Sequence, residues 1–360
     1  MLHLARIGAE NFRVFEKLSL RPHRRLNFVY GDNAEGKTTL LELVYVLARG
    51  KSFRGSSLQD CAGAAGKHWR LRGRYQQQDD GPLEVVDAGW TQGELAQKRE
   101  GQAATRLELL REYPVQILEP GLHKLLQDGP SYRRGFLDWG VFHVEQGFHV
   151  TWRRFSRALR QRNLALRQRA PDRELEPWTL ELATAGEEIQ RYRKAQLEAI
   201  RPYMDSRVKQ LLGTDQWSMD LQAGWAAGQG LKESLDAHLA RDRQQGMTQG
   251  GPQRAELRLH LHDRQTKTLV SRGQQKQLIA ALLLSQCELI YRTTGTAPIL
   301  LVDDFASELG EEYQQRLLGS LLEYPGQLFI TSFAPSGVLE KLPDAAVFHV
   351  EQGRLHPVSG

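Results

Sequence analysis

Cysteine is scarce in this chain. Among its 360 residues only Cys61 and Cys287 occur, and neither belongs to a CxxC pair or a Cys/His cluster. Their separation in the sequence argues against a disulfide framework, and their surroundings argue against a structural zinc site. We expect both thiols to be reduced and buried.

Long apolar runs are missing as well. No segment approaches the roughly eighteen apolar residues that a membrane-spanning helix needs. Residues 1–7 alternate apolar and polar positions but lack the basic region, apolar core and cleavage site of a secretory signal. We therefore expect a cytoplasmic protein with no membrane partner.

The whole chain has no strong excess of charge, but one segment does. The formal net charge is +5, with 25% charged and 40% hydrophobic residues, which is typical of a soluble globular protein. Residues 131–170 contain nine arginines and two acids, a local charge of +7. A solvated helix face is one interpretation. Contact with the phosphates of DNA is the other, since charge of one sign attracts a polyanion. The arginines that we assign to DNA are Arg133, Arg134, Arg153, Arg154, Arg157 and Arg160.

The motif that most strongly predicts chemistry is a phosphate-binding loop. Residues 31–38 match GxxxxGK[ST], follow the strand-like run 26–30 and precede the apolar, helix-like run 40–44. Backbone N–H groups of such a loop surround the β- and γ-phosphates, while Lys37 supplies positive charge and Thr38 a hydroxyl for Mg²⁺. A glycine-rich turn without a ligand is the alternative. The predicted ATP-binding residues are Gly31, Asp32, Asn33, Ala34, Glu35, Gly36, Lys37, Thr38 and Thr39.

A second motif is the apolar run 299–302, which ends in two carboxylates. Such a run is typical of a buried parallel strand, and ligands bind at the carboxyl ends of these strands. We assign Asp303 to Mg²⁺ and Asp304, with Lys37, to catalysis, since a carboxylate there would orient or deprotonate the attacking water. An ordinary Asp-Asp turn is the alternative. The strands of the two motifs are expected side by side in one sheet.

A third motif, residues 271–276, opens an apolar run at 278–284 that predicts a helix. A serine followed by glycine at this position is commonly a helix cap. The same hydroxyl and N–H groups also form an anion site, favoured by the helix dipole. With the other two motifs present, we interpret Ser271, Arg272, Gly273 and Gln274 as a surface that faces a second nucleotide-binding surface.

The order of these motifs predicts a split nucleotide domain, because the chain must leave it after the loop and return. We expect residues 1–125 and 251–360 to form it and residues 126–250 to form an inserted helical lobe. In the lobe, Trp152, Phe155, Leu159 and Leu166 have the spacing of one buried helix face. Prolines and glycines at 171, 177, 186, 202 and 213 interrupt any long arm, so a compact lobe is expected. Short strands before residue 91 predict an antiparallel layer, and residues 257–261, 327–330 and 347–355 predict further strands and a closing hairpin.

The three motifs resemble an ABC-type ATPase head, and the details resemble its SMC-like RecF branch. The resemblance rests on segments along nearly the whole chain: 11–13, 52–54, 129–139, 161–163, 271–274 and 302–309. It implies an α/β fold, in which a P-loop mixed or parallel sheet has an antiparallel layer and carries a compact α-helical insertion lobe.

The resemblance also implies a function. ATP and Mg²⁺ would bind between two copies of the chain, each loop facing the partner's Ser271 motif, so the homodimer depends on ATP. This dimer would clamp DNA at single-stranded gaps and duplex junctions, with RecR and RecO as partners, in recombinational repair, replication restart and SOS induction. Its ATPase would be stimulated by DNA. It would also be weak, because Asp304 is one methylene shorter than the glutamate of fast ABC ATPases.

The chain departs from the family pattern at several positions. Residues 251–253 read Gly-Pro-Gln where Gly-Pro-His is expected, and Gly310 stands where an aspartate is expected. Gln116 is assigned to Mg²⁺ because it lies near the place of the metal-sensing glutamine, although Glu119, Pro120 and Gly121 differ from the usual Pro-Glu pair. Thr331 and Ser332 occupy the place of the switch histidine.

Two other classes of function stay open at this point. A DNA-binding scaffold with a merely structural nucleotide predicts the same DNA affinity with and without ATP. A transporter nucleotide-binding subunit predicts no stimulation of hydrolysis by DNA, and the arginine-rich insertion argues against it.

Overall fold

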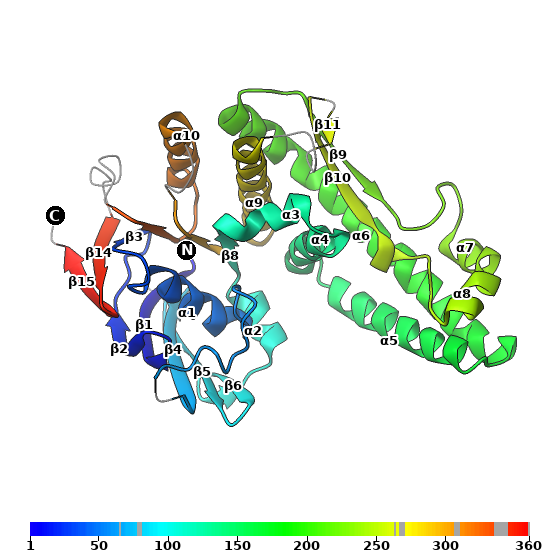
Figure 1. Ribbon diagram of the computed structural model, residues 1–360, viewed down its shortest axis with the longest axis horizontal. Helices are drawn as coiled ribbons and strands as arrows, with labels where there is room; N and C mark the ends of the chain where they lie inside the picture. Colours follow the sequence, from blue (N-terminus) through cyan, green and yellow to red (C-terminus); the bar gives the residue numbers. More distant parts are fainter. Residues whose placement is uncertain are drawn as a thin grey trace. The chain divides into compact units, whose positions relative to one another are not determined.

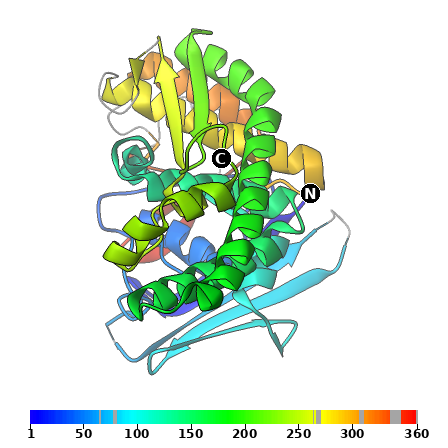
Figure 2. The same cartoon turned by 90° about the vertical axis from the view of Figure 1, so that its right-hand side faces the viewer.

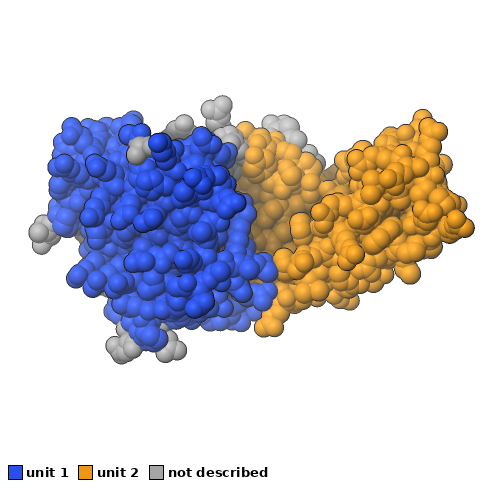
Figure 3. Space-filling view, turned by 90° about the horizontal axis from the view of Figure 1, so that it is seen from below, with its two compact units in different colours: residues 1–122, 280–360 blue, residues 123–279 orange. Residues whose placement is uncertain are grey.

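The computed structural model describes residues 1–64, 66–77, 81–262, 264–265, 271–305, 310–334 and 345–358. Residues 306–309 of the expected 302–309 motif lie outside these ranges. The chain forms two compact units, shown in different colours in Figure 3. Unit 1 comprises residues 1–122 and 280–360, and unit 2 comprises residues 123–279. The return to unit 1 thus lies at residue 279 and not at the expected 250, because the strand at 256–261 pairs within unit 2.

Unit 1 contains a six-stranded sheet that carries the nucleotide motifs. Its strand order is β15-β14-β3-β13-β12-β8. The strands are β3 (Leu26–Tyr30), β8 (Val115–Leu118), β12 (Ile299–Val302), β13 (Leu328–Ser332), β14 (Ala345–Glu351) and β15 (Arg354–Val358). All neighbours pair in parallel except β14 and β15, which form the predicted closing hairpin.

The two motif strands share this sheet but are not neighbours. β13 lies between β3 and β12, so the expectation that they lie side by side was wrong. All five residues of β13 are buried, and the strand pairs with β3 on one edge and β12 on the other. An apolar strand such as β13 is stable inside the sheet, because both of its faces are covered there and both of its edges are hydrogen-bonded.

The predicted antiparallel layer is a second six-stranded sheet, in the order β2-β1-β4-β5-β6-β7. Its strands are β1 (His3–Phe12), β2 (Phe15–Leu20), β4 (His68–Gln76), β5 (Leu83–Thr91), β6 (Glu94–Arg99) and β7 (Gln102–Ala103). Alternation of buried and more exposed residues along β4 gives this sheet one apolar and one polar face.

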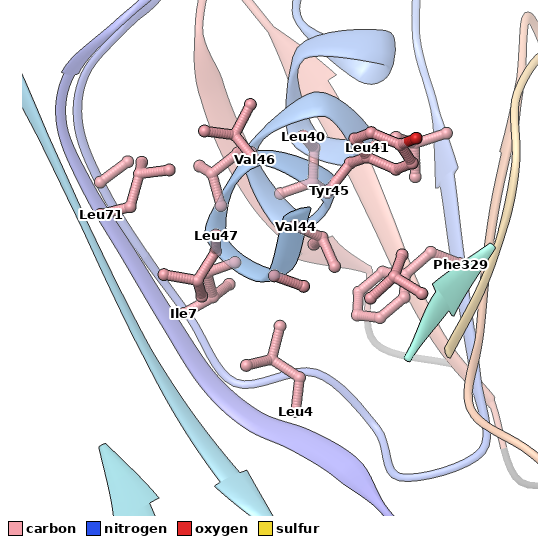
Figure 4. Packing of buried hydrophobic residues seen from close by; sticks show 14 of the residues in the cluster. Leu4, Ile7, Leu40, Leu41, Val44, Tyr45, Val46, Leu47, Leu71 and Phe329 are labelled. Carbon is pink, nitrogen blue, oxygen red and sulfur yellow. The ribbon is translucent and has the colours of Figure 1, made fainter. Parts of the chain in front are cut away.

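Helix α1 (Lys37–Arg49) lies between the two sheets and fills the core of unit 1 (Figure 4). Leu40, Val44 and Leu47 are completely buried, between Leu4 and Ile7 of the antiparallel sheet and Phe329 of the other sheet. The phosphate loop therefore opens a helix that is held from both sides. The other helical elements of this unit are α2 (Arg106–Glu112), η1 (Pro120–Leu122) and α10 (Glu311–Leu322), with the end of α9 (Arg272–Thr294) (Figure 1).

Unit 2 combines helices with a three-stranded antiparallel sheet, in the order β11-β10-β9. Its elements are α3 (His123–Gln127), α4 (Pro130–Val144), α5 (Phe148–Arg167), α6 (Asp172–Leu212), β9 (Trp217–Gln222), α7 (Leu231–Ala237), α8 (Leu239–Gln245), η2 (Pro252–Arg254), β10 (Glu256–Leu261), β11 (Arg264–Gln265) and the start of α9. Helices α5 and α6 lie side by side, as Figure 2 shows.

The lobe contains a longer helix than the sequence predicted. Helix α6 has 41 residues and includes Pro177 and Pro202, so it spans roughly 60 Å. Pro171 and Gly213 do end it, as its N- and C-terminal caps. A proline inside a helix removes one backbone hydrogen bond. Helix α6 packs against α4, α5 and α7, and this packing along the helix opposes the loss.

The buried face of α5 also differs from the prediction. Phe155 and Leu166 are buried as expected, but Trp152 is 43% exposed and Leu159 is half-buried. The residues that face the core are instead Phe148, Thr151, Phe155, Ala158, Arg162 and Leu166. This set has helical spacing but includes a charged residue, which an apolar pattern does not reveal.

Arg162 is buried and donates hydrogen bonds to residues of α6, α8 and the link that follows α8. Its Nη1 donates to Asp242 Oδ2 at 2.7 Å and to Thr248 Oγ1 at 2.8 Å, and its Nε donates to Thr179 Oγ1 at 3.0 Å. Both side chains of the Arg162–Asp242 ion pair are fully buried. Asn163 Oδ1 accepts from the backbone N–H of Thr248 at 2.8 Å. Segment 161–163, Gln-Arg-Asn, therefore joins α5, α6, α8 and the link that follows α8.

Cys61 and Cys287 are both free and buried, as predicted. Burial and the adjacent Glu42 raise the pKa of the Cys61 thiol to about 12, which keeps it protonated. Among the helices of the described ranges, none has the length and apolarity needed to span a membrane.

Candidate nucleotide site

The phosphate loop connects the end of β3 to the first turn of α1. Gly31 has φ +155 and lies against the carbonyl oxygen of Val350, so a side chain there would collide with β14. Gly36 has φ +125 and is the N-cap residue of α1. Ala34 also has positive φ, at 69. This conformation leaves the N–H groups of the first helical turn without intrahelical partners, which is the arrangement that binds anions.

A hairpin turn holds the loop from outside. The carboxylate of Glu35 accepts the backbone N–H of Gln352, and its carbonyl oxygen accepts that of Gly353 at 3.2 Å. Both contacts come from the turn between β14 and β15. Glu35 is therefore a structural residue of the loop, and its side chain is occupied by the protein itself.

Lys37 lies inside the loop. Its Nζ donates to the carbonyl oxygens of Gly31 at 2.6 Å and Asp32 at 2.8 Å. Burial lowers the pKa of Lys37, and the charges of Asp304 and Asp303 oppose this shift. The ammonium thus lies within the phosphate loop. Oxygens of a bound phosphate could replace the two carbonyl oxygens as its hydrogen-bond acceptors.

Two threonines and two aspartates form one connected set at the base of the loop. Thr38 Oγ1 donates to Asp303 Oδ1 at 3.0 Å, and Thr331 Oγ1 donates to the same oxygen at 2.8 Å. The hydroxyl of Thr331 also accepts the backbone N–H of Asp304 at 2.9 Å. The set joins the phosphate loop to the ends of β12 and β13. Thr331, which occupies the place of the switch histidine, was not among the predicted site residues.

Burial raises the pKa of Asp303, and the charge of Asp304 adds to the effect. The hydrogen bonds from Thr331 and Thr38 act in the opposite direction, because they stabilise the carboxylate. A cation placed between Thr38 and Asp303 would favour the ionised form in the same way.

The oxygens of Thr38 and Asp303 suit Mg²⁺, which prefers oxygen ligands and is usually held by one or two protein groups with phosphates and water. Within the described ranges, no cluster of three or more His, Cys, Asp or Glu side chains forms an all-protein metal site. The donor set thus fits a metal that arrives with a nucleotide.

Gln116, the third predicted Mg²⁺ residue, has its side chain bonded within its own strand. It is buried within β8, where it pairs with Leu300, and its Oε1 accepts the backbone N–H of Ile117 at 3.1 Å. The strand end nearest the carboxylates lies further on, where the carbonyl of Leu118 accepts the N–H of Asp303 at 2.8 Å. The assignment of Gln116 to Mg²⁺ therefore stays a prediction.

A pocket of about 740 Å³ lies over these groups, a volume typical of small-molecule and cofactor sites. From the predicted set it is lined by Asn33, Ala34, Gly36, Lys37, Thr38, Thr39, Asp303 and Asp304. Its other lining residues are Arg13, Val14, Arg54, Ala62, Gly63, Ala64 and Pro120. The structure thus brings the phosphate loop and the carboxylate pair to one cavity within unit 1.

Arg13 and Arg54 are pocket residues that the motif analysis did not assign to the site. Arg13 forms a two-point hydrogen bond with Glu42, at 3.0 and 2.7 Å, and Ser52 Oγ donates to the same carboxylate at 2.5 Å. Burial opposes the charge of Arg13, but Glu42 outweighs this and raises the pKa of Arg13. The signal in the sequence was a lone acid, Glu42, inside the apolar run of α1, where an unpaired carboxylate would be costly.

Ser271 forms a capping box at the start of α9. Gln274 N–H donates to Ser271 Oγ at 3.3 Å, and the N–H and hydroxyl of Ser271 donate to Gln274 Oε1 at 3.3 and 3.1 Å. Within one copy of the chain, Ser271 thus acts as a helix cap. Ser271, Gly273 and Gln274 are exposed, and the side chain of Arg272 lies outside what the structure describes. Their assignment to a second copy's nucleotide stays a prediction.

The six predicted DNA-binding arginines divide into two groups. Arg133 is buried, pairs with Glu256 at 2.6 Å and also donates to three backbone carbonyls, so its assignment to DNA was wrong. Arg134 donates to the carbonyl of Ala255 at 2.9 Å, and Arg154 pairs with Glu181 at 2.8 Å. By contrast, Arg153, Arg157 and Arg160 are exposed on α5 and make no ion pair within the described part of the chain.

The fold and the pocket together define an ABC-type ATPase head, with the antiparallel layer and helical insertion that were expected. The family described as RecF/RecN/SMC N terminal domain matches residues 3–355. The chain is 36% identical over 360 residues to the DNA replication and repair protein RecF of Pseudomonas entomophila (strain L48), covering 98% of each sequence. It is 35% identical over 354 residues to RecF of Thioalkalivibrio sulfidiphilus (strain HL-EbGR7), again covering 98% of each. The chain belongs to the RecF family.

Solved structures agree with this family. The structure of the recombination mediator protein RecF-ATP in the RecFOR pathway matches with a TM-score of 0.87 and 25% identity, covering 99% of this chain and 98% of that one. The Smc head bound to the C-winged helix domain of ScpA matches with a TM-score of 0.60 and 15% identity, covering 99% and 97%. The second likeness shows the shared head fold alone.

Proposed function

We propose that this chain is an ATP-dependent DNA repair protein whose dimer closes on ATP and clamps DNA. The observation that carries the proposal is the connected set of Thr38, Asp303, Thr331 and Asp304 beneath the phosphate loop. It joins a phosphate-binding element to a metal ligand and a candidate base. A loop that bound phosphate only for structural purposes would not need this arrangement.

In this proposal the loop N–H groups and Lys37 bind the β- and γ-phosphates, and Thr38 with Asp303 holds Mg²⁺. Bound Mg²⁺ neutralises charge on the phosphates. Asp304 orients or deprotonates the attacking water from the pocket wall. Because its side chain is one methylene shorter than glutamate, hydrolysis is slow and serves as a switch, with DNA as its stimulus.

The Ser271 motif completes the site in a second copy. The exposed hydroxyl and N–H groups at the start of α9 form an anion site at the positive end of a 23-residue helix. Ser271, Arg272, Gly273 and Gln274 of one copy then contact the γ-phosphate bound by the other. ATP thereby stabilises the homodimer.

DNA binds through the exposed arginines of α5, whose position allows them to contact phosphates. Curated relatives are named DNA replication and repair proteins, and a similar structure is that of a recombination mediator in the RecFOR pathway. We extend this role to the present chain. It acts in the cytoplasm at single-stranded gaps and duplex junctions, with RecR and RecO, in recombinational repair, replication restart and SOS induction.

The first test is Lys37→Arg. Arginine keeps the positive charge but cannot take the place of the ammonium between Gly31 and Asp32, so the variant should fold, retain some ATP binding and lose hydrolysis. ATPase activity and ATP binding are measured on single-stranded, duplex and gapped DNA. Wild-type turnover in the variant would contradict the assignment of the loop.

The same experiment separates the clamp from a DNA-binding scaffold. The clamp predicts that ATP raises DNA affinity and that Lys37→Arg changes how DNA affinity responds to ATP. A scaffold with a structural nucleotide predicts equal DNA affinity with and without ATP, and no change in the variant.

A further inference from the structure

Trp152 is the exposed tryptophan of this chain. The structure describes all seven tryptophans, and the other six are buried or half-buried, whereas 43% of Trp152 is exposed. Within the described part of the chain, its indole N–H donates no hydrogen bond and its ring contacts no other ring. A large apolar ring gains free energy when another surface covers it. The indole is therefore available to a ligand.

Helix α5 places arginines beside this ring. Trp152, Ser156 and Arg160 follow at intervals of four residues and so form one row along the helix, and Arg153 and Arg157 form the neighbouring row. All three of these arginines are exposed. Trp152, Arg153, Arg157 and Arg160 together are called the α5 surface. It combines one aromatic ring with three guanidinium groups.

The charge that α5 contributes to this surface has one sign. The helix contains six arginines and no aspartate or glutamate. Two acids of α6, Glu181 and Glu188, approach α5, and both pair with Arg154. At 3.6 residues per turn, Arg154 lies roughly 200° round the helix from Trp152. These acids are therefore on the other side of α5 from the ring.

We propose that Trp152 stacks on an unpaired base of single-stranded DNA, while Arg153, Arg157 and Arg160 contact the phosphates of the same strand. This inference rests on the proposed DNA role of α5 and adds the residue that contacts a base. Single strands are bound by aromatic rings beside positive charge, because every base has a π-face and every nucleotide a phosphate. In a duplex the base faces are covered by their neighbours. Trp152 thus gives the surface a preference for the single-stranded part of a gap.

A protein partner is the alternative occupant, since tryptophan and arginine are also frequent in protein interfaces. The surface of a typical protein carries charges of both signs, and α5 has no acid to pair with its bases. The backbone of DNA is negative along its whole length, which matches the α5 surface at every arginine. The charge therefore favours a nucleic acid strand.

The test uses the full chain with Mg²⁺ and ATP. Fluorescence anisotropy compares three labelled ligands: oligothymidylate, a strand of the same length in which every nucleotide lacks its base, and duplex DNA. The abasic strand keeps the phosphates but offers no ring for stacking. The variants are Trp152→Leu, which keeps an apolar side chain without a π-face, and Trp152→Phe, the matched control that keeps an aromatic ring.

Wild type should bind oligothymidylate more tightly than the abasic strand. Trp152→Leu should lose about tenfold in affinity for oligothymidylate, which is the effect of one stacked base, and lose nothing for the abasic strand or the duplex. The salt slope should equal that of wild type, because no phosphate contact is removed. Trp152→Phe should recover most of the affinity.

Tryptophan emission gives a second measurement that does not depend on the folding of Trp152→Leu. The difference in emission between wild type and Trp152→Phe reports on Trp152 alone. Oligothymidylate should quench this difference, because a stacked base lies against the indole. The abasic strand should leave it unchanged, and quenching by both strands would contradict stacking.

Other outcomes would also overturn the proposal. Equal loss of affinity for both single strands in Trp152→Leu would mean that the indole only supports the helix, and no loss for either would assign it to a protein contact. Equal binding of the two strands by wild type would keep the DNA role of α5 but remove stacking. Failure of wild type to bind any DNA would contradict the proposed function as well.

Discussion

Thr331 contacts both aspartates of the candidate nucleotide site. Its hydroxyl donates to the carboxylate of Asp303, the proposed metal ligand, and accepts the backbone N–H of Asp304, so one side chain joins the two aspartates. In this chain a short hydroxyl makes both contacts from the end of β13.

Replacing the Thr331 hydroxyl should shift the pH dependence of Mg²⁺-dependent ATP binding. Burial has already raised the pKa of Asp303, and the hydrogen bond from Thr331 limits that rise. In Thr331→Val the pKa rises further. Because Mg²⁺ binds the ionised carboxylate, Mg²⁺-dependent ATP binding is lost as pH falls through this pKa, and the loss should occur at higher pH in the variant. Binding of a fluorescent ATP analogue, titrated over pH with and without Mg²⁺, measures the shift.

Thr331→Ser is the matched control, since it keeps the hydroxyl and should restore the wild-type pH profile. Equal midpoints for wild type and Thr331→Val would show that Thr331 does not act on Asp303.

At this scale the sequence predicted the residues whose types are fixed by phosphate chemistry. Lys37, Thr38 and Asp303 all lie at the pocket. Thr331 and Glu42 could not be assigned in the same way, because a threonine at a strand end and a glutamate in a helix acquire their roles only through contacts distant in sequence. Gln116 was assigned by its likeness to the metal-sensing glutamine, and its role stays a prediction because its side chain is bonded within β8.

Among the elements, α5 shows what a hydrophobic pattern misses. Its buried face includes Arg162, and its exposed residues include Trp152. A pattern of apolar residues therefore predicts the helix correctly but assigns the wrong side of it to the core. The ion pair between Arg162 and Asp242 is buried and joins α5 to α8, so the side of α5 that carries Arg162 faces the core.

Breaking this pair should destabilise the helical unit strongly. Asp242→Asn leaves a buried guanidinium without a counter-charge, and the free energy of unfolding should fall by about 3–5 kcal/mol. Glu181→Gln breaks the exposed Arg154–Glu181 pair and should cost about 0–1 kcal/mol. Urea denaturation followed by circular dichroism measures both, and similar losses would refute the structural role of Arg162.

The exposed face of α5 predicts a different kind of change. Arg153, Arg157 and Arg160 follow at intervals of four and three residues and so form one stripe. Replacing all three by alanine should weaken DNA binding uniformly across sequences and lower the salt slope by about 0.9 for each phosphate that the protein no longer neutralises. Arg154→Ala, at an ion-paired position, should change little. An unchanged salt slope in the triple variant would remove this stripe from the DNA interface.

At the scale of the whole molecule, the order of motifs correctly predicted that the chain leaves the nucleotide unit and returns. It placed the return at residue 251, whereas unit 1 resumes at residue 280, and it did not predict which strand lies between β3 and β12. Strand order depends on which apolar strand is stabilised most by hydrogen bonding along both of its edges. This stabilisation arises only in the assembled sheet. Likewise, α6 remains a single helix through two prolines because its neighbours bury one face along its length.

The central claim is that ATP joins two copies of the chain through the Ser271 motif. Ser271→Arg places a bulky cation at the exposed start of α9 and should block this contact without affecting ATP binding by one copy. Ser206→Arg, at an exposed position in α6, is the control. Sedimentation with and without ATP should show a wild-type and Ser206→Arg dimer that requires ATP, and a Ser271→Arg monomer in both conditions. The same ATP-driven dimer in Ser271→Arg would contradict the account.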